Sequence, residues 1–587
     1  MPYSQTGYPS VDRPWLKYYK KDIYELPDTD TSMFRFLYEC NKNRLDDIAL
    51  NYFGKQISFR SMFVHIDSIA LMLRNLGVRK GQYVSLCALN IPEFFYLLYA
   101  VNKIGAVCNW IGLTSPIADI HEQLVTTKSE IVFTVSIAYE QVLDAAINTN
   151  VNRIIAIPVN NSMPIFMKTI IEAFSFFQKG IKFRKSDFIE TIKWGNIYDV
   201  KKNKEVMALD QADSQLEGNN IAMIEYTGGT TGVPKGVMLS NKALNSYYIN
   251  FALSNINGMS HYKERESYFS GVPLFLAFGV SACCHGPLCH GMELILAPDP
   301  SPKAGMKIIL KSRVNHIITG RVMIEGIIKE LSSRKKADLS HIYSVMYGGE
   351  ESNKKWEKSV EERLSHYNMR ASVLNGYGMT ECAAAVMIEL NNEKGGMIPL
   401  GNVNVKVVDP DDFRIELGYG IEGELCISSN TIMEGYYGRI KETKDVIFED
   451  KGAKWLRTHD LAVISVEGYI TITGRMKRIF SKLTSDDIQV RVYPMRTEEV
   501  IMSDKDVKMC AVIGIKDDIT AYRTVAYIIR NSIKEDEEST LQRIDVLCRR
   551  KLPESHVPDK YIFVDEFPLT RAGKVDYREL ESRAGKL

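Results

Sequence analysis

The segment from Tyr226 to Gly236 combines hydroxyls, glycines and one lysine, reading Tyr-Thr-Gly-Gly-Thr-Thr-Gly-Val-Pro-Lys-Gly. Glycines let backbone N–H groups approach an anion closely, threonine hydroxyls add donors, and Lys235 adds a positive charge for phosphate oxygens. The segment therefore predicts a polyphosphate-binding loop. The residues expected to contact the phosphates are Thr227, Gly228, Gly229, Thr230, Thr231, Gly232 and Lys235.

Apolar stretches surround this loop, 221–224 before it and 237–239 after it, and both are expected to be strands. A P-loop is excluded by spacing. Its Gly-Lys-Ser/Thr end opens a helix, whereas Lys235 lies between Pro234 and Gly236. A glycine- and threonine-rich surface turn is the structural alternative, although such a turn needs few hydroxyls.

The loop resembles the signature of the adenylate-forming enzymes, the superfamily of acyl-CoA synthetases, nonribosomal-peptide adenylation domains and firefly luciferase. The segment Asn375-Gly-Tyr-Gly-Met-Thr-Glu381 is similar to that family's second signature. The resemblance implies that Thr380 bonds the α-phosphate of ATP, that Glu381 coordinates magnesium, and that Tyr377 packs on the adenine. A carboxylate is an oxygen ligand that suits Mg²⁺. Gly376 and Gly378, on either side of Tyr377, belong to the same expected nucleotide site.

A glycine pair upstream, within Tyr347-Gly348-Gly349-Glu350, resembles the segment that lies along the adenine in this family. The resemblance implies nucleotide contacts for Gly348, Gly349 and Glu350. For Glu350 taken alone, a tight turn followed by a helix cap is an equal alternative.

The ribose site is expected from Trp455-Leu-Arg-Thr-His-Asp460, which resembles the family's Tyr/Trp-x-x-Thr-Gly-Asp. The resemblance implies that Asp460 bonds the ribose hydroxyls. His459 stands where the family has glycine, so a left-handed backbone there would cost about 1 kcal/mol or more. Gly-Arg475-Met-Lys477 resembles the family's hinge, which implies that Arg475 lies near the ribose and that Lys477 is the pivot between two domains.

Lys574 ends a segment, Pro568 to Lys574, that resembles the Pro-x-x-x-x-Gly-Lys signature of the family's C-terminal domain. The resemblance implies an electrostatic catalytic role. The ammonium would bridge the substrate carboxylate and the α-phosphate while negative charge accumulates on phosphorus. Read alone, a lysine near a C-terminus is usually exposed and without function.

The substrate class is indicated by Val272 to Gly279, which resembles the family's acyl-pocket motif. Leu276 replaces the usual histidine or aromatic residue, and the expected lining is Phe275, Leu276, Phe278 and Gly279. No aspartate follows soon afterwards, and a buried ammonium without a carboxylate is costly, so an amino-acid substrate is disfavoured. A fatty acid is the first expectation, and an aromatic or polycyclic acid is the second.

The acyl acceptor is expected to be coenzyme A, the usual acceptor in the family. The loop after the hinge, 479–493, is longer than usual and has no glycine to let pantetheine pass. Two alternatives therefore stay open: an acyl-AMP ligase that loads a separate carrier protein, and a non-catalytic nucleotide-binding homologue. ATP, Mg²⁺ and coenzyme A are the cofactors that the resemblance implies.

The expected fold is α/β. Strands such as 83–89 alternate with helices such as 92–104, which is typical of a mostly parallel sheet covered on both faces. We expect a large N-terminal AMP-binding domain, 1–474, with two α/β subdomains (31–215 and 219–401) and a β-rich subdomain (402–474). A small mobile α+β domain, 475–587, follows, with strands near 508–515, 524–529 and 560–565 around a helix at 540–551.

The composition is that of an ordinary globular protein. A chain of 587 residues is too long to fold around a single hydrophobic core, so more than one structural unit is expected. Its net charge of +1 gives no sign of a nucleic-acid partner. The ten cysteines show no framework spacing and predict free thiols in a reducing cytoplasm. Crowded ligands from Cys283 to His290 match no common zinc spacing, so a metal site there is a weak alternative to a helix.

No secretory signal and no membrane-spanning run is expected. One amphipathic stretch, Met163 to Lys179, has a polar stripe, a broad apolar face and basic residues directly after it, through 185. Such a helix could lie in a bilayer interface as a peripheral contact, or it could cover the acyl tunnel. Packing against the parent domain is the structural alternative.

Overall fold

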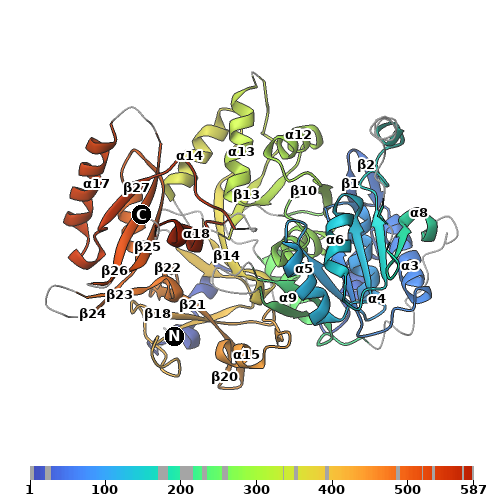
Figure 1. The fold of residues 1–587 in the computed structure, drawn as a ribbon, viewed down its shortest axis with the longest axis horizontal. Coiled ribbons are helices and arrows are strands. Elements are labelled where there is room, and N and C mark those ends of the chain that lie inside the picture. Colours follow the sequence, from blue (N-terminus) through green and yellow to red (C-terminus); the bar gives the residue numbers. More distant parts are fainter. Residues whose placement is uncertain are drawn as a thin grey trace.

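The computed structural model describes most of the chain, with the side chains of residues 250–253 and 477 excepted. The described residues are 6–19, 28–169, 183–184, 186–198, 216–227, 234–253, 262–334, 336–349, 354–390, 396–483, 489–517, 520–531, 536–570 and 574–584. Figure 1 shows two large layered regions side by side and a smaller C-terminal region, drawn in red, at one end.

An eight-stranded sheet in the order β19-β9-β8-β4-β3-β5-β6-β7 forms the first region. Its strands are β3 (Tyr83–Cys87), β4 (Val107–Ile111), β5 (Ile131–Val135), β6 (Arg153–Ile157), β7 (Glu190–Lys193), β8 (Ile221–Tyr226), β9 (Gly236–Ser240) and β19 (Gly435–Tyr436). The sheet is parallel from β8 through β7, and β8-β9-β19 are antiparallel. The predicted mostly parallel sheet is therefore confirmed.

A fourteen-stranded sheet forms the second region, in the order β17-β18-β21-β22-β16-β15-β14-β13-β12-β10-β11-β1-β2, with β20 paired to β21. Its strands are β1 (Ile48–Tyr52), β2 (Lys55–Ser58), β10 (Ser267–Ser270), β11 (Glu293–Leu296), β12 (His316–Thr319), β13 (Ser344–Gly348), β14 (Val373–Met379), β15 (Ala384–Glu389), β16 (Met397–Pro399), β17 (Asn404–Val408), β18 (Gly423–Ser428), β20 (Ile447–Asp450), β21 (Ala453–Ile464) and β22 (Ile470–Arg475).

The predicted boundaries between the two α/β subdomains are wrong, because the sheets exchange strands. β1 lies in the predicted first unit but pairs with β11 of the second sheet, while β8 and β9 lie in the predicted second unit but join the first sheet. Period-2 patterning identifies a strand without identifying its partner. The β-rich segment likewise continues the second sheet, since Met397 of β16 pairs with Ile470 of β22.

Helices cover both sheets, and some of them begin at residues that favour a helix N-terminus. Ser58 caps α3 by accepting a hydrogen bond from the Ser61 N–H, and Pro92 occupies the first turn of α4. The helices before the C-terminal region are α1 (Pro9–Asp12), α2 (Met33–Asn41), α3 (Phe59–Asn75), α4 (Pro92–Lys103), α5 (Ile117–Thr127), α6 (Tyr139–Ala146), α8 (Trp194–Ile197), α9 (Asn241–Leu253), α10 (Ala277–Val280), α11 (Gly286–Cys289), α12 (Pro302–Ser312), α13 (Arg321–Ser332), α14 (Lys354–Ser365) and α15 (Ile440–Val446).

The C-terminal region has its own small sheets and apolar clusters. Its elements are the hairpin β23 (Phe480–Leu483) and β24 (Gln489–Val492), the sheet β25 (Val507–Asp517), β26 (Ala521–Arg530) and β27 (Lys560–Phe563), and helices α16 (Pro494–Met502), α17 (Glu537–Lys551) and α18 (Tyr577–Ala584). Two buried clusters, one under α17 and one under α18, form its core. The α/β fold class with a small C-terminal α+β region is confirmed. The boundary between 474 and 475 stays a prediction.

Among the described residues, no helix has the length and apolar character needed to cross a bilayer. The amphipathic stretch is described only at its start, where residues 165–169 are helical. Ile165 and Phe166 are exposed there, whereas Met167 packs against the main core. The rest of the predicted helix, 170–179, lies outside the described residues.

Candidate active site

Tyr377, Asp460 and Arg475 form one connected group, although they come from β14, β21 and β22. The Tyr377 hydroxyl donates to Asp460 Oδ2 at 2.6 Å, and Arg475 Nε donates to Oδ1 at 2.7 Å. Asp460 is buried, so these two donors fix the plane of its carboxylate. Burial and the Asp460 charge raise the pKa of the Tyr377 hydroxyl well above its ordinary value, which keeps it a donor. A carboxylate has about four acceptor positions, so Asp460 can accept further hydrogen bonds.

His459 has a left-handed backbone, with φ of 59°. The strain expected at this position is therefore present. Its imidazole Nδ1 lies 3.0 Å from Glu424 Oε1, and its backbone N–H donates to the same oxygen at 3.2 Å. Sequence reasoning missed Glu424, a fully buried carboxylate in β18. A single acid between apolar strand residues, in Gly423-Glu-Leu-Cys-Ile427, was the available signal.

The glycine-rich segment 226–236 is described only at its base. The Thr227 N–H donates to the Lys235 carbonyl at 3.0 Å, and the Lys235 N–H donates to Thr227 Oγ1 at 3.2 Å. These paired hydrogen bonds bring Thr227 and Lys235 together where β8 ends and β9 begins, as the flanking strands predicted. The predicted phosphate contacts Gly228, Gly229, Thr230, Thr231 and Gly232 lie outside the described residues.

Glu381 and Lys235 are joined through a residue that sequence reasoning missed, Tyr436. The Tyr436 hydroxyl donates to Glu381 Oε1 at 2.7 Å, and Lys235 Nζ lies 4.5 Å from the centre of the Tyr436 ring. Cation–π contact of this kind holds an ammonium without neutralising it. Thr380 begins the short 3-10 helix Thr380–Cys382 that also carries Glu381. A carboxylate and a hydroxyl at one turn suit a hard divalent cation such as Mg²⁺, which would neutralise phosphate oxygens.

Gly378 has no room for a side chain. A Cβ at this position would lie 2.0 Å from the Ala384 carbonyl oxygen, because β14 and β15 change register between Tyr377 and Gly378. The glycine therefore allows the irregularity that directs Tyr377 toward Asp460. Gly376 is less restricted, since its nearest neighbour would be 3.8 Å away, and it pairs with Gly348 of β13. Glu350 lies outside the described residues.

Lys574 lies over Gly349, at the end of β13. A Cβ on Gly349 would be 3.2 Å from Lys574 Cε and 3.7 Å from its Nζ. The predicted catalytic lysine thus reaches the segment expected to line the adenine, and glycine permits the close approach. The lysine backbone is fixed locally, because the Thr570 N–H donates to the Lys574 carbonyl at 2.6 Å and the Lys574 N–H donates to Thr570 Oγ1 at 3.2 Å.

The predicted acyl-pocket residues surround the start of α10. Phe275, Leu276 and Phe278 are half-buried and pack against the main core. Gly279 is buried, and a Cβ there would lie 2.0 Å from the Pro273 carbonyl oxygen, so α10 can close on the preceding turn only with glycine. The Phe275 ring faces Gly112 at the end of β4, 3.6 Å from where a Cβ would lie. The motif therefore lies between the two sheets.

The cysteine- and histidine-rich stretch, Cys283 to His290, is largely buried. All ten cysteines are free, and in the described part of the chain no group of three or more His, Cys, Asp or Glu side chains could hold a metal ion. His285 is fully buried, 3.1 Å from the Tyr99 hydroxyl through Nδ1 and 3.1 Å from Asn245 Oδ1 through Nε2. Burial lowers the pKa of His285 to about 3. The stretch falls on helical segments before β11, as predicted.

The predicted hinge lies in the described backbone directly after β22. Residues Met476–Arg478 form a 3-10 turn, and the side chain of Lys477 lies outside the described residues. Arg478 donates to Glu498 of α16 at 2.5 Å and stacks on the Tyr577 ring at 3.9 Å. The residue after the predicted pivot is thus anchored in the C-terminal region.

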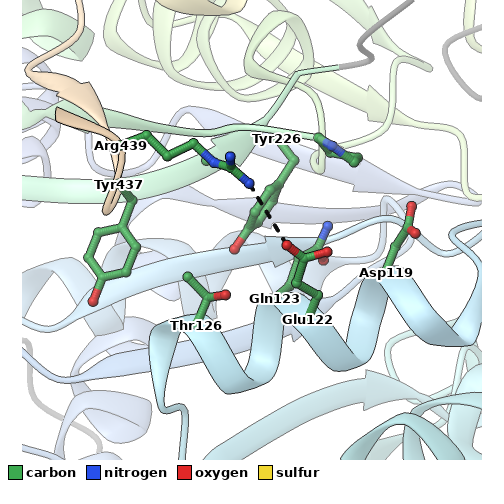
Figure 2. Close-up of a pocket in the computed structure, with 9 residues that line it drawn as sticks. Asp119, Glu122, Gln123, Thr126, Tyr226, Tyr437 and Arg439 are labelled. Carbon is green, nitrogen blue, oxygen red and sulfur yellow. Dashed lines mark ion pairs between the residues drawn. The ribbon is translucent and has the colours of Figure 1, made fainter. Parts of the chain in front are cut away.

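A small pocket lies between α5 and the end of β8, next to the two ends of the glycine-rich segment (Figure 2). Tyr226 and Tyr437 line it, and Arg439 Nη2 faces Glu122 Oε1 at 3.9 Å. Pro234 and Gly236 of the glycine-rich segment also line this pocket, whereas Tyr377, Asp460, Arg475 and Lys574 do not.

Comparison with known proteins gives consistent matches. The model of the AMP-binding enzyme family matches residues 37–437, and that of the AMP-binding enzyme C-terminal domain matches 496–574. The chain is 26% identical to a long-chain-fatty-acid–CoA ligase of Bacillus subtilis (strain 168), over 97% of each chain. It is 24% identical to 4-coumarate–CoA ligase 3 of Oryza sativa subsp. japonica, over 87% of this chain and 84% of the relative.

A solved structure shares the fold. It is the anthranilate CoA ligase AuaEII in complex with anthranoyl-AMP, with a TM-score of 0.77 and 19% identity over 96% of this chain and 100% of that one.

Proposed function

The chain belongs to the AMP-binding enzyme family, and on that basis we propose that it is an ATP-dependent acyl-CoA synthetase. The substrate carboxylate attacks the α-phosphorus of ATP, which forms acyl-AMP and releases pyrophosphate. The thiol of coenzyme A then attacks the acyl carbonyl carbon, forming a thioester and releasing AMP. The contact between Lys574 and Gly349 is the observation that supports this proposal most. It joins the C-terminal region to the segment expected to bind the nucleotide.

We assign the nucleotide contacts as follows. Asp460, held by Tyr377 and Arg475, accepts hydrogen bonds from the ribose hydroxyls, and Tyr377 packs on the adenine beside Gly348, Gly349, Gly376 and Gly378. Lys235 and the glycine-rich loop bind the β- and γ-phosphates, and Thr380 bonds the α-phosphate. Mg²⁺, when bound at Glu381, would neutralise charge on the phosphate oxygens. Tyr436 supports this arrangement because it contacts both Lys235 and Glu381.

Lys574 supplies the electrostatic part of the first step. Its ammonium compensates negative charge that develops on the α-phosphate oxygens during attack. The C-terminal region must then move to admit coenzyme A. We propose that residues 1–474 and 475–587 act as two domains about Lys477. Separate cores support this, as do exposed charge pairs between the regions, Arg491 with Asp411 and Arg496 with Glu422.

A fatty acid is the proposed substrate. The apolar lining of Phe275, Leu276 and Phe278 supports it, and so do relatives named long-chain-fatty-acid–CoA ligases. An aromatic acid is the second candidate, supported by the relative named 4-coumarate–CoA ligase. A separate carrier protein is the alternative acceptor. The cytoplasmic location expected from cysteine usage stays a prediction.

The direct test is product analysis. The protein is incubated with ATP, Mg²⁺, coenzyme A and one acid at a time, and acyl-CoA, AMP and pyrophosphate are quantified. We expect equal amounts of the three products with a fatty acid. Acyl-AMP without thioester would favour the carrier-protein alternative, and the absence of any acid-dependent AMP would contradict the proposal.

Leu276→Trp is expected to shift preference from long to short fatty acids. The indole would fill the depth of the proposed pocket, and each methylene that loses its contact costs about 0.8 kcal/mol. Losing room for two or three carbons should lower the palmitate-to-octanoate ratio of kcat/KM about tenfold or more. Leu276→Met, which keeps the volume, is the control. An unchanged ratio in Leu276→Trp would place the acyl tail elsewhere.

We also propose that the helix beginning near Met163 touches a lipid bilayer, supported by the exposure of Ile165 and Phe166. The double substitution Ile165→Ser and Phe166→Ser should reduce co-sedimentation with phosphatidylcholine/phosphatidylglycerol vesicles several-fold. Ile440→Ser, which removes an exposed apolar side chain on α15, is the control. Equal sedimentation of the parent and the double variant would contradict membrane contact through this helix.

A further inference from the structure

The strand that carries Asp460 is bulged immediately before this residue. On β18, Glu424 pairs with Leu461 and Cys426 pairs with Arg457, so Leu425 alone faces Thr458, His459 and Asp460. This bulge contains one left-handed residue, a conformation that glycine adopts most easily. Here His459 takes that conformation, at φ 59°. The position of the Asp460 carboxylate therefore depends on a strained residue.

Glu424 bonds the chain on both sides of Thr458. Its Oε1 accepts from the His459 backbone N–H at 3.2 Å and lies 3.0 Å from His459 Nδ1. Its Oε2 accepts from Arg457 Nε at 2.9 Å and Nη2 at 2.7 Å. The carboxylate is fully buried, whereas His459 and Arg457 are partly exposed. One side chain of β18 thus holds two residues of the bulge.

The remaining bulge residues are fixed by the same pair of strands. Thr458 Oγ1 donates to the Leu425 carbonyl at 2.8 Å and accepts from the Asp460 N–H at 3.1 Å. Residues 457 to 460 are therefore each bonded, directly or through Thr458, to β18. The Asp460 carboxylate then meets Tyr377 and Arg475 on the opposite side.

Charge and burial indicate how the bulge tolerates a histidine. A left-handed backbone is unfavourable for a residue other than glycine, whereas hydrogen bonds to a charged group are stronger than those between neutral groups. Burial opposes ionisation of Glu424, but the hydrogen bonds from His459 and Arg457 outweigh it and lower the pKa of this carboxyl. The contacts to Glu424 therefore oppose the cost of the left-handed backbone at His459.

We propose that Glu424 and His459 form a positioning pair that sets the Asp460 carboxylate for recognition of the ribose hydroxyls. The inference rests on the proposed function, because it takes Asp460 as the ribose ligand. Neither residue contacts the nucleotide in this account. Glu424 acts through the bulge, by holding His459 in a conformation that glycine would adopt unaided.

The test compares binding of ATP with that of 2′-deoxy-ATP, measured by calorimetry without an acid substrate, in five forms of the full chain. These forms are the parent, Glu424→Gln, His459→Gly, the double variant, and Glu449→Gln as an exposed carboxylate control on β20. We expect the parent and the control to prefer ATP. Glu424→Gln should reduce that preference about tenfold, since its amide cannot hold both donors as a carboxylate does.

The double variant separates positioning from general damage. Glycine adopts the left-handed backbone without strain, so adding His459→Gly to Glu424→Gln should restore most of the preference for ATP. His459→Gly alone should change that preference less than about threefold. The proposal would be overturned if Glu424→Gln preferred ATP over 2′-deoxy-ATP as strongly as the parent does. It would also be overturned if the loss of preference in the double variant equalled the sum of the losses in the two single variants. If Glu424→Gln does not fold, Glu424→Asp is compared with and without His459→Gly in the same way.

Failure of the proposed function gives a different pattern. A parent that binds ATP with preference over 2′-deoxy-ATP but makes no acyl-AMP would reject the ligase and leave the pair testable. A parent that binds both nucleotides equally would reject Asp460 as the ribose ligand and with it the positioning pair.

Discussion

Lys574→Ala is expected to reduce acyl-AMP formation by about two to three orders of magnitude, the effect typical of removing one group that stabilises transition-state charge. Thiolysis of supplied acyl-AMP should change by less than about threefold. In the proposed two-domain account the two steps need different placements of the C-terminal region, and the placement in this structure, with Lys574 over Gly349, is the one assigned to the first step. Acid-dependent pyrophosphate exchange measures the first step, and conversion of acyl-AMP to acyl-CoA measures the second.

The control is Lys551→Ala, which removes an exposed lysine at the end of α17. It should leave both steps near the parent rates. Equal losses in both steps with Lys574→Ala would contradict the division of labour, because a damaged C-terminal core would slow every step that this region takes part in.

Glu381→Gln is expected to have the second largest effect. The amide keeps the shape and can still accept the Tyr436 hydroxyl, but it lacks the charge that a divalent cation requires. The magnesium concentration for half-maximal adenylation should rise about tenfold or more, and the maximal rate should fall. Binding of Mn²⁺ in the presence of ATP, followed by electron paramagnetic resonance, should weaken in parallel.

Tyr436→Phe gives the graded comparison for Glu381. It keeps the ring on which Lys235 rests but removes the hydroxyl that orients the carboxylate. Its magnesium requirement should lie between those of the parent and Glu381→Gln. Superimposable magnesium titrations of Glu381→Gln and the parent would show that Glu381 is not a metal ligand.

Local patterns predicted the elements around the site well. The strands on both sides of the glycine-rich loop and the strands and helix of the C-terminal region form where apolar patterns predicted them. Resemblance to family signatures also selected residues that meet in space, such as Tyr377 with Asp460 and Lys574 with Gly349. Roles for these residues stay proposals.

Tertiary pairing is what the sequence did not reveal. The strand Ile48–Tyr52 pairs with the distant β11. The sequence could not reveal this pairing, because an apolar run predicts a strand that is buried on both faces but does not indicate which strand lies beside it. Glu424 and Tyr436 were missed for the same reason. Each acts on a site residue from another strand, and neither contact follows from spacing along the chain.

The central claim is that the chain activates a fatty acid as its adenylate, and exchange of labelled pyrophosphate into ATP tests it most directly. The account predicts exchange that requires Mg²⁺ and palmitate, proceeds without coenzyme A, weakens with aromatic or bile-type acids, and is lost in Lys574→Ala. A folded protein that binds ATP but shows no exchange with any fatty acid would contradict the claim, whether or not an aromatic or bile-type acid supports exchange.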